Sequence, residues 1–136
     1  MGLLSEGKVT TMGAEKRFEN KVKKFLIEQG CYFIKYWGGG KFTKSGITDL
    51  LICCNSYFLG VEIKSSTGRP SELQLWNINQ IKKAGGIGII LYPEQFDRFQ
   101  QLIKKLKGGI TCNIVIQEFN ALTNVDSNTN CGISTK

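Results

Sequence analysis

The sequence predicts a single mixed α/β domain in which helices flank a central mixed β-sheet. Three observations lead to this fold class. Apolar residues recur at helical spacing in three segments, two apolar runs are joined by a short polar turn, and residues 87–92 form a short, fully apolar run of the kind found in buried strands. The predicted order is helix, three strands, helix and strand, followed by a further helix and strand. A chain of 136 residues has room for one such domain.

The first predicted helix covers residues 14–29 and ends before Gly30. Its apolar positions repeat at helical spacing and comprise Phe18, Val22, Phe25 and Leu26. Residues 31–37 follow as a predicted strand. Residues 38–45 then form a flexible, basic loop that contains Lys41 and Lys44.

A β-hairpin is predicted for residues 48–54 and 57–64, because both arms are rich in apolar and aromatic residues. Asn55 and Ser56 between them are typical turn residues, so the simplest connection is a two-residue loop. In that register the numbers of paired residues sum to 111. An odd-numbered loop would instead change the pairing along the whole hairpin.

This register places two acids opposite each other, Asp49 on the first arm and Glu62 on the second. Facing carboxylates destabilise a strand pair, whereas a bound divalent cation converts their repulsion into ligation. Lys64 lies two residues beyond Glu62 on the same face. Solvated acids at strand ends are common, but these two interrupt two of the most apolar segments of the chain, which favours a metal site.

The remaining elements are a loop over residues 65–70, a helix over 71–84, the apolar strand 87–92, a helix over 95–107 and a strand over 112–118. Lys104, Lys105 and Lys107 suit the negative end of the third helix dipole. We therefore divide the chain into a flexible N-terminus (1–13), a folded domain (14–121) and a disordered polar tail (122–136).

Composition narrows the possible chemistry. Eighteen Lys and Arg against eleven Asp and Glu give 18 − 11 = +7, a surplus that favours a polyanion such as nucleic acid. The absence of histidine excludes Ser-His-Asp hydrolases, Cys-His proteases and nucleases with histidine ligands. The five cysteines lack the spacing of a zinc or redox motif. With no signal peptide and no long apolar run, we expect a cytoplasmic protein without membrane contact or small-molecule cofactor.

Residues 14–92 resemble the PD-(D/E)xK phosphodiesterase superfamily, and within it the virus-type replication-repair nucleases and the archaeal Holliday junction resolvases. The resemblance rests on Glu19 in the first helix, on Ser45-Gly46-Ile47-Thr48-Asp49, on Glu62-Ile63-Lys64 and on Gln74 in the second helix. Thr48 replaces the proline that usually precedes the aspartate. The resemblance implies a restriction-endonuclease-like core with αβββαβ order and Mg²⁺- or Mn²⁺-dependent hydrolysis of DNA.

By the same resemblance, Asp49, Glu62 and Glu19 would be metal ligands, together with the backbone carbonyl of Ile63. Lys64 would orient or deprotonate the attacking water and stabilise charge on the phosphate. Such resolvases act as homodimers on branched DNA, such as a Holliday junction or a flap, in the replication or recombination of a phage or mobile element.

Two site assignments have alternatives. Glu15 also lies near the start of the first helix, and Glu19 is spaced for an ordinary ion pair with Lys23. Gln74 belongs to the motif Ser71-Glu72-Leu73-Gln74, which matches a capping box, so it is either a helix cap or an active-site residue.

Four basic residues are candidates for contacts with DNA phosphates: Lys35, Lys41, Lys44 and Arg69. Tyr36 and Trp37 either stack on an unpaired base or belong to the core. The sequence leaves open whether cleavage is endo- or exonucleolytic. It also leaves two other functions open, a catalytically silent nucleic-acid-binding module and a sequence-specific restriction enzyme.

Overall fold

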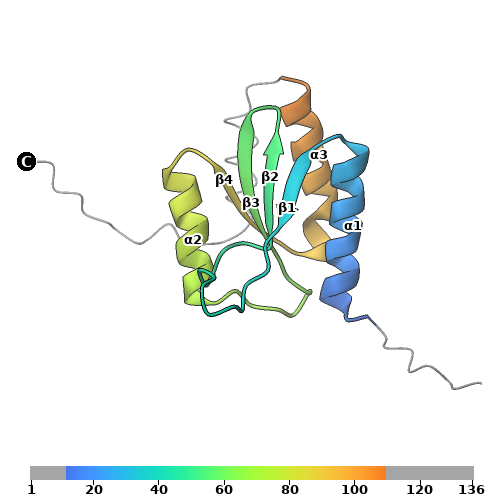
Figure 1. The fold of residues 1–136 in the computed structure, drawn as a ribbon. Coiled ribbons are helices and arrows are strands. Elements are labelled where there is room, and N and C mark those ends of the chain that lie inside the picture. The colour runs from blue at the N-terminus through green and yellow to red at the C-terminus, as the bar shows by residue number, and fades with distance from the viewer. Residues whose placement is uncertain (1–11, 110–136) are drawn as a thin grey trace, which may run out of the picture.

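The computed structural model describes residues 12–109. In chain order these residues form α1 (Ala14–Glu28), β1 (Tyr32–Lys35), β2 (Leu50–Cys54), β3 (Tyr57–Ile63), α2 (Glu72–Lys83), β4 (Ile87–Leu91), a 3₁₀ turn (Pro93–Gln95) and α3 (Phe96–Lys107) (Figure 1). The predicted strand at residues 112–118, the tail from residue 122 and most of the predicted flexible N-terminus lie outside the described residues.

The four strands form one mixed sheet in the order β1-β2-β3-β4. β1 and β3 both pair antiparallel with β2, whereas β4 pairs parallel with β3. Parallel neighbours need a crossover connection, and α2 supplies it between β3 and β4. The predicted mixed sheet flanked by helices is therefore confirmed.

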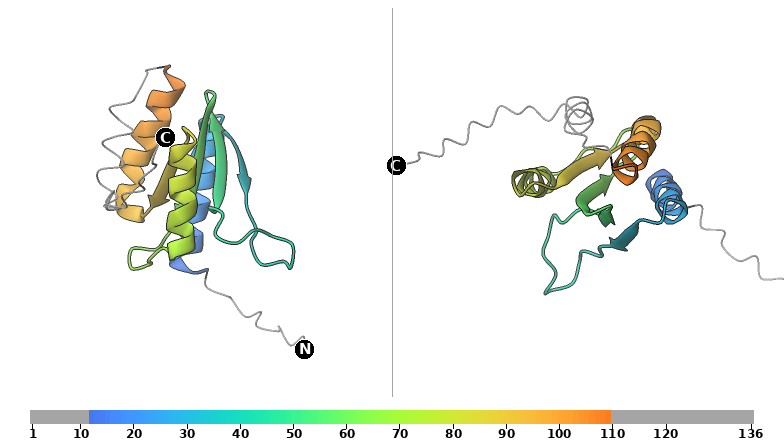
Figure 2. Two further views of the ribbon diagram at one scale, coloured as in Figure 1. Left: turned by 90° about the vertical axis from the view of Figure 1, so that its left-hand side faces the viewer. Right: turned by 90° about the horizontal axis from the view of Figure 1, so that it is seen from above.

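Helices cover both faces of the sheet. α1 and α3 lie on one face and α2 lies on the other (Figures 1 and 2). The main core lies between the sheet and the α1/α3 pair, where Phe25 packs edge-to-face against Phe96 and Phe99. Every residue of β4 is buried, as the apolar run at residues 87–92 predicts.

Two glycines allow α2 to approach the opposite face closely. A Cβ atom at Gly60 of β3 would lie 2.3 Å from Cδ1 of Ile81, and one at Gly88 of β4 would lie 2.6 Å from the Ile78 carbonyl oxygen. Side chains at these two positions would push the helix off the sheet. The start of α2, which carries Gln74, is thereby held beside the end of β3.

The hairpin has the predicted register. Asn55 and Ser56 form a two-residue loop with φ angles of 46° and 70°, the left-handed backbone that such tight hairpin loops need. Cys54 pairs with Tyr57 and Leu50 with Val61, so paired numbers sum to 111. β2 begins at Leu50, which leaves Asp49 immediately before the strand.

Where element boundaries differ from the predictions, they differ by one or two residues. The first strand covers Tyr32–Lys35 rather than residues 31–37, because the amide of Cys31 still bonds to the Leu26 carbonyl at the end of α1 and the chain leaves the sheet before Trp37. A 3₁₀ turn containing Pro93 takes the place of the start of the last helix. No helix within residues 12–109 is long and apolar enough to cross a membrane.

Candidate active site

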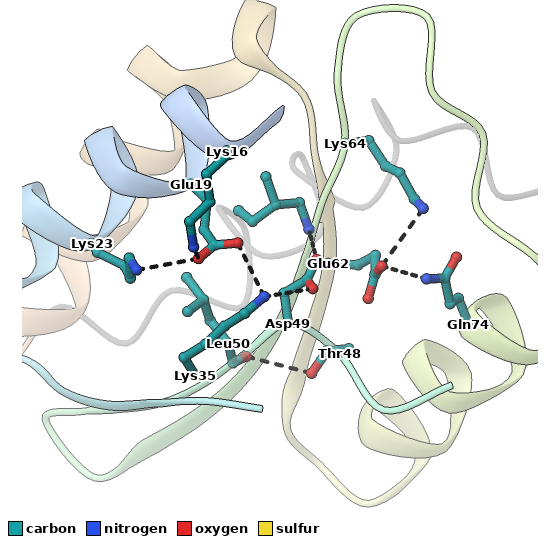
Figure 3. Close-up of polar contacts among 11 residues, drawn as sticks. Lys16, Glu19, Lys23, Lys35, Thr48, Asp49, Leu50, Glu62, Lys64 and Gln74 are labelled. Carbon is teal, nitrogen blue, oxygen red and sulfur yellow. Dashed lines mark hydrogen bonds and ion pairs between the residues drawn. The ribbon is translucent and has the colours of Figure 1, made fainter. Parts of the chain in front are cut away.

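The predicted site residues from four separate elements converge at one end of the sheet (Figure 3). Asp49 precedes β2, Glu62 lies near the end of β3, and Lys64 directly follows that strand. Glu19 comes from α1 and Gln74 from the first turn of α2. The site therefore spans both faces of the sheet, with Asp49 between the α1 side and the α2 side.

The backbone around Asp49 is fixed on both sides. Its carbonyl oxygen accepts a 2.9 Å hydrogen bond from the amide of Tyr36, which closes the base of the β1–β2 loop. Gly46, with φ at 76°, lies so close to α2 that a Cβ atom would be 2.4 Å from Cγ of Leu73. The segment leading to Asp49 therefore packs directly against α2.

Both carboxylate oxygens of Asp49 are bound. Oδ2 accepts a 2.8 Å hydrogen bond from the backbone amide of Ile63, and Oδ1 accepts one of 2.9 Å from the Lys35 ammonium. The first bond places the Ile63 peptide beside the acid. The carbonyl of Ile63, which the resemblance implies as a ligand, belongs to the next peptide, which joins Ile63 to Lys64.

Glu62 is a buried acid with one unsatisfied oxygen. Its side chain accepts a hydrogen bond from Nε2 of Gln74 on Oε1, and the Lys64 ammonium lies 3.7 Å from the same oxygen. Oε2 is buried and has no partner among the described residues. Burial, together with the neighbouring negative charge of Asp49, raises the pKa of Glu62 to about 7.

Gln74 is a helix cap and also contacts Glu62. Its side-chain Oε1 accepts a 2.8 Å hydrogen bond from the backbone amide of Ser71. Its backbone amide donates to Oγ of Ser71 at 3.2 Å, which completes a capping box. Its Nε2 remains available and donates to Glu62. The start of α2 therefore holds the Glu62 carboxylate in position.

Glu19 points into the structure, whereas Glu15 is exposed. Three ammonium groups surround the Glu19 carboxylate, those of Lys16 at 2.9 Å, Lys35 at 3.0 Å and Lys23 at 3.2 Å. Burial alone would raise the pKa of Glu19, but the hydrogen bonds from these lysines lower it to about 2. Glu19 is therefore an ionised acid whose charge is already neutralised.

The proposed DNA-binding residues fall into two groups. Lys41, Lys44 and Arg69 are exposed. Lys35 is not, since its side chain is 16% exposed and its ammonium bridges Glu19 and Asp49. In this structure Lys35 is a cation within the site and not a surface contact.

The fit of a divalent metal depends on Asp49 and Glu62. No three His, Cys, Asp or Glu side chains within residues 12–109 gather closely enough to hold a metal ion. Asp49 and Glu62 nevertheless supply oxygen donors of the kind that Mg²⁺ and Mn²⁺ prefer, and Oε2 of Glu62 is a buried acceptor to which no other described residue donates. Two hard carboxylates at a partly open strand end fit such an ion. Glu19 fits less directly because three ammonium groups already surround its carboxylate, whereas Asp49 is bonded to the Lys35 ammonium alone among the described lysines.

Lys16 is the site residue that sequence reasoning missed. It lies three residues before Glu19, a spacing at which helix side chains meet, so the same reasoning that pairs Glu19 with Lys23 would have found it. The bridge made by Lys35 depends on how α1 packs on the sheet, and no local pattern indicates it.

Comparison with known proteins gave no match to a family model, to a curated protein or to a solved structure.

Proposed function

We propose that this protein is a metal-dependent DNA endonuclease that hydrolyses phosphodiester bonds, selectively on branched DNA. The observation that carries the proposal is the buried Oε2 of Glu62, which has no hydrogen-bond partner within residues 12–109 and lies beside a second acid, Asp49. Leaving such a group unsatisfied costs free energy, and the cost is offset if the two carboxylates hold a cation in the working protein.

Asp49 and Glu62 would hold Mg²⁺ or Mn²⁺ together with the Ile63 carbonyl. When bound, the ion would supply Lewis acidity toward a phosphate oxygen and lower the pKa of a coordinated water. The chain's own residues would prepare the rest of the site. Gln74 fixes the Glu62 carboxylate, and the Ile63 amide and the Lys35 ammonium fix Asp49.

Lys64 would provide positive charge toward the substrate. Its ammonium lies 3.7 Å from Glu62, which is longer than a tight hydrogen bond, and its side chain is 14% exposed. A phosphate oxygen near Glu62 would therefore attract this ammonium, which can stabilise the negative charge that develops on the phosphate. The surplus of seven positive charges favours the approach of DNA.

A cleavage panel tests this function. Labelled linear, flapped, splayed and four-way DNA substrates are incubated with Mg²⁺ or Mn²⁺, with wild-type protein and with Asp49→Ala. We expect the wild type to nick branched substrates and the variant to be inactive. Cleavage that survives in Asp49→Ala would refute the site assignment, and equal cleavage of the linear and branched substrates would refute structure selectivity.

The second candidate is a nucleic-acid-binding module without activity. The observation that favours it is the placement of Lys35, which supplies a permanent positive charge between Glu19 and Asp49. Calorimetry separates the two functions. An endonuclease should bind Mg²⁺ or Mn²⁺ and gain thermal stability from it, whereas a silent module should show neither effect.

We also propose that the protein acts as a homodimer, because the strands of a four-way junction are related by two-fold symmetry. We propose in addition that it acts in the cytoplasm. Light scattering during size-exclusion chromatography should give twice the mass of one chain.

A further inference from the structure

The loop between β1 and β2 begins and ends at the proposed active site. Lys35 at its first end and Asp49 at its second are joined by a 2.9 Å ion pair, and the bond from the Tyr36 amide to the Asp49 carbonyl closes the base. Between these points the chain leaves the sheet and extends away from the body of the protein (Figure 2). The loop is therefore anchored at both of its ends to a residue of the proposed site.

The tip of the loop is a hydrogen-bonded turn. Gly40 accepts bonds from the amide of Thr43 at 3.1 Å and from its hydroxyl at 2.8 Å, and the same hydroxyl accepts a bond from the amide of Gly39 at 3.1 Å. Lys41 and Phe42 occupy the two central positions of this turn. The hydroxyl of Tyr36 donates to the Lys44 carbonyl and connects the second half of the loop to its base.

Phe42 is fully exposed at this tip, with a relative exposure of 101%. Its ring does not return to the protein surface, because the turn points it outward. Lys41 and Lys44 on either side are exposed as well. An aromatic ring between two cations, on a turn held by its own hydrogen bonds, has the chemistry of a side chain that stacks on a base while its neighbours bind phosphates.

A second exposed ring lies nearer to the acids. Trp37 is 71% exposed, and the ammonium groups of Lys16 and Lys35 lie 5.4 Å and 5.5 Å from the centre of its ring. Three glycines and Lys41 separate Trp37 from Phe42 in the chain, and Lys35, which lies over the Trp37 ring, bonds to Asp49.

We propose that Phe42 recognises branched DNA by stacking on a base that is exposed where the duplex is interrupted. The proposal rests on the function proposed above, since it places the interruption beside Asp49 and Glu62. A continuous duplex offers no such base, because its bases are stacked on both faces. A flap, nick or junction offers one at the branch point, where inserting a ring costs little unstacking.

Binding without cleavage tests the proposal. Affinities for a flap, a four-way junction and a continuous duplex of equal length are measured by fluorescence anisotropy in EDTA, for the wild type and for Phe42→Ala, Phe42→Trp and Phe58→Ala. Phe58 is the matched control, since it is 48% exposed but lies at the opposite end of β3 from Glu62. Melting temperatures show that each variant is folded.

We expect Phe42→Ala to weaken binding to the branched DNAs by roughly 5- to 100-fold, the effect of losing one base stack. Its affinity for continuous duplex should change less than about twofold, since that binding is electrostatic. Phe42→Trp should restore the selectivity, and Phe58→Ala should leave it unchanged. A 2-aminopurine base at the branch point should change its fluorescence with wild-type protein and not with Phe42→Ala.

Two results would overturn the proposal. One is a wild type that binds all three DNAs equally, and the other is a Phe42→Ala variant that keeps the preference for branched DNA. Failure of the nuclease function looks different. In that case selective binding would depend on Phe42, yet no substrate would be cut when Mg²⁺ is added.

Discussion

At the scale of single residues, the environment of Glu62 disfavours the charged form of its carboxylate. Burial and the charge of Asp49 raise its pKa from 4.5 to about 7. A raised folded-state pKa favours the protonated form, so its contribution to stability is fully present below pH 4.5 and is lost as the pH rises through 7. The wild type should therefore become less stable across this range when no metal is present.

Glu62→Gln should remove this pH dependence, because a neutral amide has no charge to bury. In EDTA we expect the variant to match the wild type at pH 4 and to exceed its free energy of unfolding at pH 8 by about 2 to 3 kcal/mol. Urea unfolding at both pH values measures the difference, with the exposed Glu28→Gln as control. Equal stability of the two proteins at pH 8 would show that the fold does not disfavour the charged form of Glu62.

Lys35 has the opposite role, since it neutralises two acids at once. Lys35→Met keeps much of the aliphatic side chain but leaves Glu19 and Asp49 without their shared cation. We expect a loss of about 3 kcal/mol in the free energy of unfolding at pH 7.

Lys24→Met is the matched control for Lys35, because Lys24 is exposed on α1, and it should change stability by less than about 0.5 kcal/mol. If Lys35→Met cost no more than this control, the bridge would have no structural importance.

The closeness of Asp49 and Glu62 could be predicted from the sequence, whereas the surroundings of Glu19 could not. The hairpin register follows from the length of the Asn55-Ser56 loop and from the two-residue alternation of strands, both of which are local. Lys35 bonds to Glu19, which is 16 positions away in the chain, and to Asp49, which is 14 positions away. The bridge therefore depends on the packing of α1 against the sheet.

At the scale of elements, the start of α2 links helix stability to the site through Gln74. Ser71→Ala removes the N-cap side chain but leaves Gln74 in place, and we expect it to cost about 1 kcal/mol. Gln74→Ala removes both the capping box and the donor to Glu62, so it should cost more.

The two α2 variants should also differ in activity. Ser71→Ala should keep near-wild-type cleavage at a temperature where it is folded, whereas Gln74→Ala should lose activity because the Glu62 carboxylate is no longer held. Thermal unfolding and single-turnover cleavage of branched DNA measure the two effects. Equal loss of activity in both variants would mean that Gln74 acts only as a helix cap.

The order and type of the elements within residues 12–109 follow from sequence periodicity, but their ends do not. The apolar run of β4 and the helical spacing of apolar residues in α3 identify these two elements. The late start of β1 follows from the bond of the Cys31 amide to the end of α1, and the 3₁₀ turn at Pro93 is closed by a bond from the Gln95 amide to the Tyr92 carbonyl. Phe42 is fully exposed on a turn that local hydrogen bonds between Gly40 and Thr43 close.

At the scale of the whole molecule, the net charge of +7 should dominate the affinity for DNA. If Lys41, Lys44, Arg69 and Lys64 each neutralise one phosphate, raising the salt from 50 to 200 mM should weaken binding roughly 100-fold. Anisotropy titrations over this range measure the slope. Lys41→Ala should reduce the slope by about one ion for branched and continuous DNA alike, and a slope near zero would contradict an electrostatic interface.

The central claim is that Asp49 and Glu62 form a metal-dependent phosphodiesterase centre, and Asp49→Asn tests it most directly. Asparagine keeps an oxygen that can accept the Ile63 amide bond but removes the negative charge. The measurement is the single-turnover rate of nicking of a labelled flap or four-way junction as Mg²⁺ is titrated. We predict Mg²⁺-dependent nicking by the wild type and a rate at least about 100-fold lower for Asp49→Asn. Nicking by Asp49→Asn at the wild-type rate, or no nicking by the wild type at any Mg²⁺ concentration, would contradict the account.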